Sequence, residues 1–162
     1  MKRSRPNLVH QHGFTLLEAM VAMIIFSVGL LGLGALQMAS MGNTQSALYQ
    51  SVAAQLAYGM ADRIRANPVG RQTNQYDSLG KKPTGTLCSS GCSPSQVATR
   101  DDFEWVSDIE NLLPAGQGTV LGDGSEFTIT VMWDASRNGA TGTNCNPAVK
   151  TDLKCLKLFV RP

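Results

Sequence analysis

The sequence predicts an α+β protein in which one long N-terminal helix packs on a small antiparallel sheet. The helix is predicted by an apolar run from Phe14 to Leu36, which a proline-free amphipathic stretch extends to Ala66. The sheet is predicted by two segments near the C-terminus in which apolar and polar residues alternate. Apolar residues are concentrated before residue 61, whereas the later part of the chain is polar and rich in glycine.

The run from Phe14 to Leu36 is long enough to cross a membrane. As a helix it would measure about 35 Å, which exceeds the roughly 30 Å of a hydrocarbon core. Three basic residues precede it, Lys2, Arg3 and Arg5, and a basic flank marks the cytoplasmic side of a membrane span. We therefore expect the chain beyond residue 40 to be exported. A conventional cleaved signal peptide is not favoured, because its apolar region is shorter and ends at a small-x-small site.

The helix is expected to continue beyond the membrane as an amphipathic segment. Apolar residues recur at every fourth position, at Leu48, Val52, Leu56, Met60 and Ile64, and Ala53 and Ala57 widen the stripe. The other faces would carry polar residues, namely Gln50, Gln55, Arg63 and Arg65. Pro68 should end the helix near Ala66, because the residue before a proline disfavours helical geometry. The whole helix would be roughly 80 Å long.

Residues 67–100 are expected to form a long loop region, followed by a short helix. Thr99 or Asp101 would cap this helix, and Pro114 and Gly116 would end it. Its apolar face would consist of Phe103, Val106, Ile109 and Leu113. We interpret Asp101, Asp102 and Glu104 as charges of the helix N-terminus and not as metal ligands. The aromatic residues Phe103, Trp105 and Trp133 are expected in the core or on a sheet face.

The two predicted strands lie on either side of a loop at residues 135–152. Over residues 127–133, Phe127, Ile129, Val131 and Trp133 alternate with Thr128, Thr130 and Met132. The segment LKCLKLFVR at 153–161 is the expected partner strand, with Leu156, Leu158 and Val160 on one face. An antiparallel pair of this kind would form the centre of the sheet.

The four cysteines, Cys88, Cys92, Cys145 and Cys155, all lie in the part expected to be exported. They could form disulfides, bind a metal or remain free thiols. Zinc sites favour tighter C-x2-C spacings than the C-x3-C and C-x9-C present here. Of the three possible connectivities we expect Cys88–Cys92 with Cys145–Cys155, because the local pairing has the smallest loop-closure entropy.

The inventory of reactive residues does not favour an enzyme. Both histidines, His10 and His12, precede Phe14, so a chain cut there would lack the commonest general base and metal ligand. No paired acid/base or nucleophile motif is present, and we expect no cofactor, no metal and no small-molecule substrate. A net charge of +2, with Lys81-Lys82 as the basic pair of the exported part, does not favour a nucleic acid, which needs clustered phosphate contacts.

Glu18 is the one charged residue in the apolar run, and every position from Ala19 to Ala61 is uncharged. A carboxylate in hydrocarbon costs roughly 2–3 kcal/mol even on lenient insertion scales. If the chain were cut between Gly13 and Phe14, the new α-ammonium group of Phe14 would lie four residues away on the same helix face. Pairing with this amine, or with that of a neighbouring subunit, would offset the cost. It would also set the register between stacked helices.

These residues resemble the class III signal sequence of type IV pilins, in which a basic leader ends in glycine and FTLLE, here at 14–18, opens an apolar helix. The resemblance implies cleavage after Gly13 and N-methylation of Phe14 by prepilin peptidase. It also implies the lollipop fold of type IV pilins. Glu18 would then act in the assembly of the apolar helices into a filament core.

Further segments resemble the PilV minor pilins of type IVa pili. They are VAMIIFSVGLLGLGALQ, ADRIRANP at 61–68, DDFEWVSDIENLLPAGQG and TITVMWD. The resemblance implies a protein that primes pilus assembly in the inner membrane together with other minor pilins and the major pilin, and so serves adhesion and twitching motility. A major pilin fits less well, because its apolar segment typically contains a proline and none lies between Phe14 and Ala66.

The expected organisation has four parts: a leader at 1–13, a transmembrane and filament-core helix at 14–40, the amphipathic half of that helix at 41–67, and a periplasmic globular domain at 68–162. The chain would cross the inner membrane once, with its N-terminus cytoplasmic, before it joins the extracellular pilus. Two other functions remain open. One is a minor pseudopilin of a type II secretion system, which shares the leader and the helix, and the other is a tip adhesin.

Overall fold

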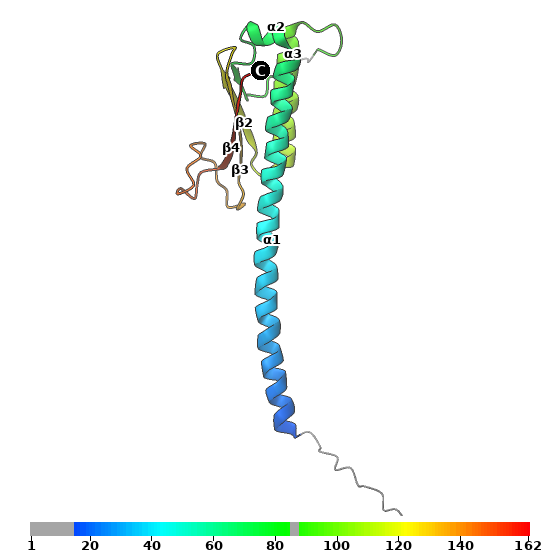
Figure 1. Cartoon of the computed structure of the whole chain (residues 1–162), viewed down its shortest axis with the longest axis vertical. Helices are drawn as coiled ribbons and strands as arrows, with labels where there is room; N and C mark the ends of the chain where they lie inside the picture. The colour runs from blue at the N-terminus through cyan, green and yellow to red at the C-terminus, as the bar shows by residue number, and fades with distance from the viewer. Residues whose placement is uncertain (1–14, 85–87) are drawn as a thin grey trace, which may run out of the picture. The chain divides into compact units, whose positions relative to one another are not determined.

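The computed structural model describes residues 15–84 and 88–162. The elements follow in the order α1 (Leu16–Ala66), α2 (Pro68–Gln72), β1 (Ser78–Leu79), α3 (Pro94–Leu112), β2 (Gln117–Gly122), β3 (Phe127–Trp133) and β4 (Lys154–Val160) (Figure 1). The chain divides into two compact units, of which the first runs through Asn43 and the second comprises Thr44–Pro162. The predicted α+β class, with a long N-terminal helix and a small antiparallel sheet, is confirmed.

Helix α1 ends at Ala66, as the sequence predicts, because Asn67 and Pro68 stop it. Asn67 then caps α2, since its side-chain oxygen accepts a hydrogen bond from the N–H of Gly70 at 3.0 Å. At the other end α1 begins at Leu16, two residues after the expected start, and Phe14 lies outside the described residues. The predicted loop at 67–100 is wrong in part, because it contains α2, β1 and the first turns of α3.

The second unit has its core between the C-terminal part of α1 and the sheet. The buried residues of α1 are Tyr49, Ala53, Ala57, Met60, Ala61 and Ile64, which confirms most of the predicted stripe. Leu48 is a correction, because it is 59% exposed. A strict i+4 repeat rotates by about 40° at each step, so its first member has left the face that Met60 and Ile64 define. The alanines keep the helix close to the layer beneath it.

The sheet has four antiparallel strands in the order β1-β2-β3-β4. The predicted strand at 127–133 and its pairing with the C-terminal segment are confirmed, with Ile129 opposite Leu158. Strand β2 was not predicted, because its sequence QGTVLG holds two glycines and little alternation. One of these, Gly118, is required by packing, since a Cβ there would lie 2.5 Å from the Cδ1 of Ile109 and 2.7 Å from the ring of Trp105.

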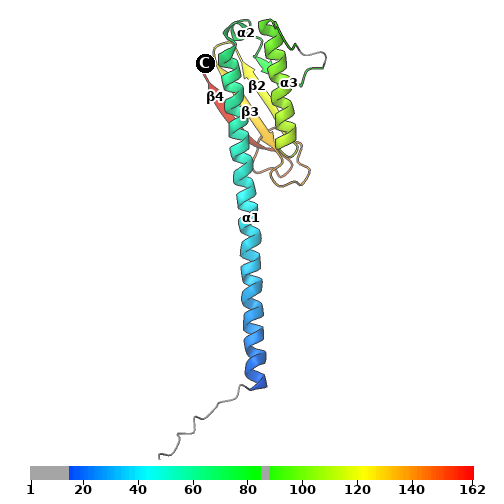
Figure 2. The ribbon, with the colours of Figure 1, turned by 90° about the vertical axis from the view of Figure 1, so that its right-hand side faces the viewer.

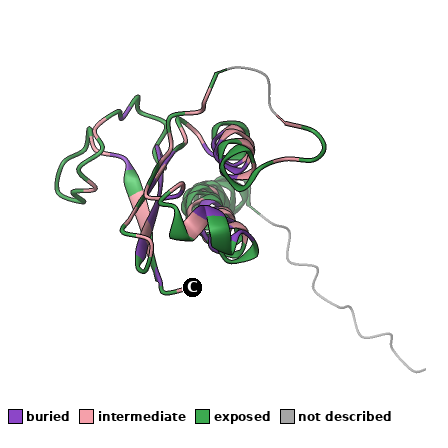
Figure 3. Ribbon diagram, turned by 90° about the horizontal axis from the view of Figure 1, so that it is seen from above, coloured by how far each residue is buried: buried purple, intermediate pink, exposed green. Residues whose placement is uncertain are grey.

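Helices α1 and α3 lie side by side on one face of the sheet, with their buried sides turned toward it (Figures 2 and 3). Trp105 of α3 is 2% exposed, and its indole Nε1–H donates to the carbonyl of Leu56 in α1 at 2.9 Å. This hydrogen bond joins the two helices where they pack against each other. The prediction that Trp105 and Trp133 are buried aromatics is confirmed, whereas Phe103 is only half-buried.

Helix α3 begins at Pro94, well before the expected start near Thr99. Its N-cap is Ser93, whose hydroxyl oxygen accepts from the N–H of Gln96, while the Gln96 side chain accepts from the N–H of Ser93. This is a capping box, and the pattern S-x-x-Q at 93–96 was its signal in the sequence. Asp101, Asp102 and Glu104 are therefore in the middle of the helix and not at its N-terminus.

Candidate assembly site

The N-terminal part of α1 carries an apolar surface that the described chain leaves uncovered. Every large apolar residue between Leu16 and Met41 is exposed: Leu16, Leu17, Met20, Val21, Met23, Ile24, Ile25, Phe26, Val28, Leu30, Leu31, Leu33, Leu36, Met38 and Met41. They surround the helix and do not form one stripe, which is typical of a helix that is buried in lipid or among other helices. By length and composition α1 is able to span a membrane.

The start of α1 holds Glu18 in its first turn. Thr15 precedes the helix, and its hydroxyl oxygen accepts a hydrogen bond from the backbone N–H of Glu18 at 3.3 Å. Thr15 is thus the N-cap and Glu18 the third helical residue, the spacing of a capping box. The capping role of Thr15 was not predicted, although the T-x-x-E pattern at 15–18 is its signal in the sequence. A negative side chain here also faces the positive end of the helix dipole.

The carboxylate of Glu18 is exposed. Within residues 15–84 and 88–162 it has no hydrogen bond and no ion pair, because the contact with Thr15 uses only the backbone N–H. Gly13 and Phe14 lie outside the described residues, so the geometry between the Phe14 amine and Glu18 stays a prediction. What the structure contributes is an exposed carboxylate at the end of an uncovered apolar helix.

The glycines of this segment have no packing role within the chain. A Cβ built at Gly29, Gly32, Gly34 or Gly42 would meet no atom within 4 Å. Each glycine costs an isolated helix about 1 kcal/mol relative to alanine. No packing contact in the described chain therefore accounts for these glycines.

A polar network in the second unit fixes the C-terminal end of α1. Arg63 donates to Asp101 at 3.1 Å and to Glu104 at 2.7 Å. Asp101 also accepts from the hydroxyl of Tyr76 at 2.6 Å, and Tyr76 accepts from the Asn67 amide at 3.1 Å. Burial and the bond to Asp101 raise the pKa of Tyr76. Two of the three acidic residues assigned to a helix N-terminus therefore join α3 to α1 instead.

Asp102 has a separate contact on the other side of α3. Its side chain is buried and accepts from the N–H of Gly80, at the end of β1, at 2.8 Å. Burial raises the pKa of this carboxyl above its ordinary value of 3.8, although hydrogen bonds from the Gly80 and Lys81 N–H groups oppose the shift. No cluster of three or more potential metal ligands occurs among the residues that the structure describes.

We predict that Asp102→Asn and Asp102→Ala differ in stability. Asparagine keeps an acceptor for Gly80 and carries no buried charge, so the free energy of unfolding at pH 7 should stay within about 1 kcal/mol of the unaltered chain. Alanine leaves the Gly80 N–H without its partner and should cost about 1–3 kcal/mol. Denaturant unfolding followed by tryptophan fluorescence measures this, since Trp105 and Trp133 both lie in the second unit.

The sign of the pH dependence follows from the raised pKa. The folded state binds the proton of Asp102 more tightly than the unfolded state, so this group favours folding below about pH 3.8 and ceases to do so as pH rises through the folded pKa. The free energy of unfolding of Asp102→Asn, relative to that of the unaltered chain, should therefore increase from pH 3 to pH 7. A difference that is constant over this range would contradict the assignment.

The loop between β3 and β4 is held against both the sheet and α1. Arg137 donates to the hydroxyl of Tyr49 at 2.7 Å, and its guanidinium lies 6.0 Å from the centre of the Tyr49 ring. Disulfides join Cys145 to Cys155 and Cys88 to Cys92. The first of these packs in a small cluster with Met132, Ala140 and Leu153 on the sheet face opposite the helices. The second closes an exposed turn before α3.

We predict that loss of the Cys145–Cys155 disulfide destabilises the second unit more than loss of Cys88–Cys92. The chain-entropy contribution is about 2.8 kcal/mol for the larger loop and about 2.1 kcal/mol for the smaller, and the cysteines of the larger loop also pack against a buried apolar cluster. The paired substitutions Cys145→Ser/Cys155→Ser and Cys88→Ser/Cys92→Ser form a matched comparison in denaturant unfolding. A difference of only about 0.7 kcal/mol, which loop length alone gives, would show that the cluster contributes nothing, and equal destabilisation would contradict the prediction.

These features define a class of protein: a folded α+β unit whose first helix extends into an apolar, uncovered segment that begins with a carboxylate. Two family models match the chain. One is the prokaryotic N-terminal methylation motif at residues 8–34, and the other is the type IV pilin Tt1218 at residues 35–103. No curated protein and no solved structure was found to match. The two matches support a type IV pilin, and type IV pilins are structural, non-enzymatic proteins. A prepilin signal that is followed by an apolar helix fits membrane anchoring and incorporation into a pilus.

Proposed function

We propose that the chain is a minor pilin of the PilV family that prepilin peptidase processes and that helps to prime type IV pilus assembly. The observation that carries this proposal is the match of residues 8–34 to the methylation motif, together with an apolar helix that has no cover of its own. A leader removed next to such a helix leaves a subunit that can move from lipid into a bundle of similar helices. Lipid would cover the apolar surface of the helix before assembly, and the neighbouring helices of the bundle would cover it afterwards.

The roles of individual residues follow from this order of events. Cleavage between Gly13 and Phe14 creates the amine that is methylated, and removes the basic residues of the leader. Glu18 then has a cationic partner available on its own chain or on a neighbour. A neighbour's amine is favoured in the fibre, because an ion pair between subunits fixes the axial register of adjacent helices. The chain crosses the inner membrane once, with the second unit in the periplasm, where its disulfides form.

A priming role agrees with the segments that resemble PilV minor pilins. It also agrees with the number of disulfides, because the second unit has two. A major pilin typically has a single disulfide, which closes its C-terminal loop. The other minor pilins, the major pilin and prepilin peptidase are the proposed partners. A minor pseudopilin of a type II secretion system is the second candidate, favoured by the same leader and helix. A tip adhesin would use the same anchor and differ only in what the second unit binds.

Deletion of the gene should lower the number of surface pili strongly while major pilin remains abundant in the membrane. The reason is that only the first few subunits must form unfavourable isolated contacts, so a priming subunit acts in few copies. Electron microscopy counts the pili, immunoblotting measures major pilin, and a twitching assay measures their use. Complementation with the full chain is the control. Normal pilus numbers with a secretion defect would instead assign the chain to the pseudopilins.

A further inference from the structure

Strand β4 forms an open edge of the sheet. It pairs with β3 along its whole length, from Lys154 to Val160, and has no second strand neighbour among the described residues. The helices lie on a face of the sheet (Figures 2 and 3) and supply no strand partner. Every second residue of β4 therefore directs its backbone N–H and C=O groups away from the sheet. The opposite edge is much shorter, since β1 has two residues.

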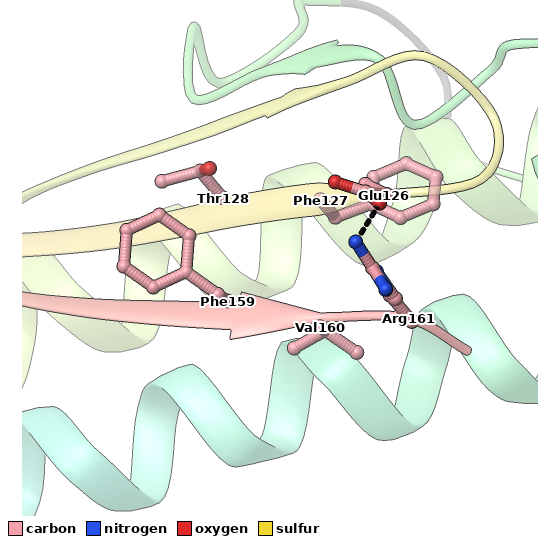
Figure 4. Close-up of a pocket in the computed structure, with 6 residues that line it drawn as sticks. All are labelled: Glu126, Phe127, Thr128, Phe159, Val160 and Arg161. Atoms are coloured by element: carbon pink, nitrogen blue, oxygen red, sulfur yellow. Dashed lines mark ion pairs between the residues drawn. The ribbon is translucent and has the colours of Figure 1, made fainter.

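Apolar side chains along this edge are incompletely covered. Ile129 and Val131 of β3 are fully buried, but their cross-strand neighbours Leu158 and Leu156 in β4 are only half-buried. On the other face Phe159 is 75% exposed. It lies beside a hollow of about 420 Å³ lined by Glu126, Phe127, Thr128, Phe159, Val160 and Arg161 (Figure 4). One further strand would cover these side chains and pair the free backbone groups.

The charge of the edge indicates what kind of strand fits. Lys154 and Lys157 are exposed and have no ion-pair partner in the described part of the chain, whereas Arg161 is paired with Glu126. No acidic residue occurs from Leu153 to Pro162. A second copy of β4 would bring like charges together, which destabilises a strand pair. A strand with glutamate or aspartate opposite Lys157 would gain a cross-strand ion pair instead.

We propose that the β4 edge binds an extended, acidic segment of a different protein by adding it as a fifth strand. Backbone hydrogen bonds would supply the affinity, and Lys157 together with the half-buried leucines on the other face would supply the preference for a sequence in which acidic and apolar residues alternate. The apolar residues of the segment would lie on the face of Leu156 and Leu158, and its acidic residues on the face of Lys157. The inference goes beyond the proposed function and does not depend on it, because it concerns the second unit alone.

The test uses the full chain in detergent micelles and two capped seven-residue peptides, one alternating valine with glutamate and the other valine with lysine. Residue-resolved hydrogen exchange measures the exchange rates of the β4 backbone amides. In the free chain, alternate β4 amides should exchange quickly, and the glutamate peptide should slow them while the lysine peptide does not. Protection of all β4 amides in the free chain, or no response to the glutamate peptide, would overturn the proposal. Protection that rises with the concentration of the chain alone would also overturn it, since a second copy would then be the occupant.

Two matched charge reversals, one in β4 and one outside it, distinguish binding at the β4 edge from a general effect of net charge. Lys157→Glu should weaken binding of the glutamate peptide roughly two- to fivefold and improve binding of the lysine peptide. Lys150→Glu makes the same change of charge at an exposed loop position outside β4 and should alter neither. Both substitutions are at exposed positions, and tryptophan fluorescence confirms that the second unit stays folded. Equal effects of the two substitutions would overturn the proposal.

Discussion

Replacing Glu18 with alanine is expected to leave cleavage and membrane insertion intact and to prevent incorporation into fibres. Insertion should not suffer, because the substitution removes a carboxylate that costs roughly 2–3 kcal/mol in hydrocarbon. The helix start should also persist, since the hydrogen bond to Thr15 uses the backbone N–H of residue 18. What is lost is the partner of the Phe14 amine on a neighbouring subunit. Immunoblots of sheared fibres and of membranes measure the two pools.

Glu18→Gln is the matched control for this prediction. Glutamine keeps the length of the side chain and can take the same place in a capping box, but it carries no charge. If the ion pair sets the register, Glu18→Gln should fail as Glu18→Ala does. If assembly needs only a polar side chain of this length, Glu18→Gln should assemble normally. Recovery of Glu18→Ala in sheared fibres at the level of the unaltered chain would contradict the role of Glu18 altogether.

Replacing Gly13 with leucine is the second change with a large expected effect. In the proposed processing, prepilin peptidase approaches the backbone closely to cut after residue 13, and a bulky side chain there would keep it away. Mass spectrometry of the membrane-bound protein should find the leader 1–13 still attached and Phe14 unmethylated. The retained leader keeps Lys2, Arg3 and Arg5 and leaves Phe14 without the free amine that a neighbouring subunit would pair with, so the chain should also be absent from fibres.

Gly13→Ala provides the comparison, because its side chain adds a single methyl group. It should be cut more completely than Gly13→Leu, and tryptophan fluorescence should report the same folded second unit in both. Complete cleavage of Gly13→Leu would show that this position does not restrict the peptidase. Loss of the folded second unit in either variant would show that the leader acts on folding.

The elements that sequence predicts best are those in which one local pattern determines the outcome. Strand β3 lies in a segment where Phe127, Ile129 and Val131 alternate with threonines, so its existence follows from the side chains alone. Helix α1 ends where Pro68 removes helical geometry from the residue before it. The apolar segment with Glu18 at its start is likewise recognised from one continuous stretch of sequence. Each of these features follows from residues that are close together in the chain.

The features that sequence reasoning missed depend on residues far apart in the chain. Asp101 lies near Arg63 and Tyr76 only because α3 packs beside the end of α1, and nothing in the segment DDFE indicates this partner. Strand β2 has little pattern of its own, and its glycine at 118 is explained only by the ring of Trp105 above it. The open edge of β4 is a property of the strand order and could not be derived from the strand itself.

The N-terminus of the unaltered mature protein is the measurement that tests the central claim most directly. The chain is proposed to become a fibre subunit through one cut next to the apolar helix. Mass spectrometry of the protein isolated from membranes and from sheared fibres should therefore find a chain that begins at Phe14 and carries one methyl group on its α-amine. A mature N-terminus at any other residue, or an intact leader in the fibre fraction, would contradict the account.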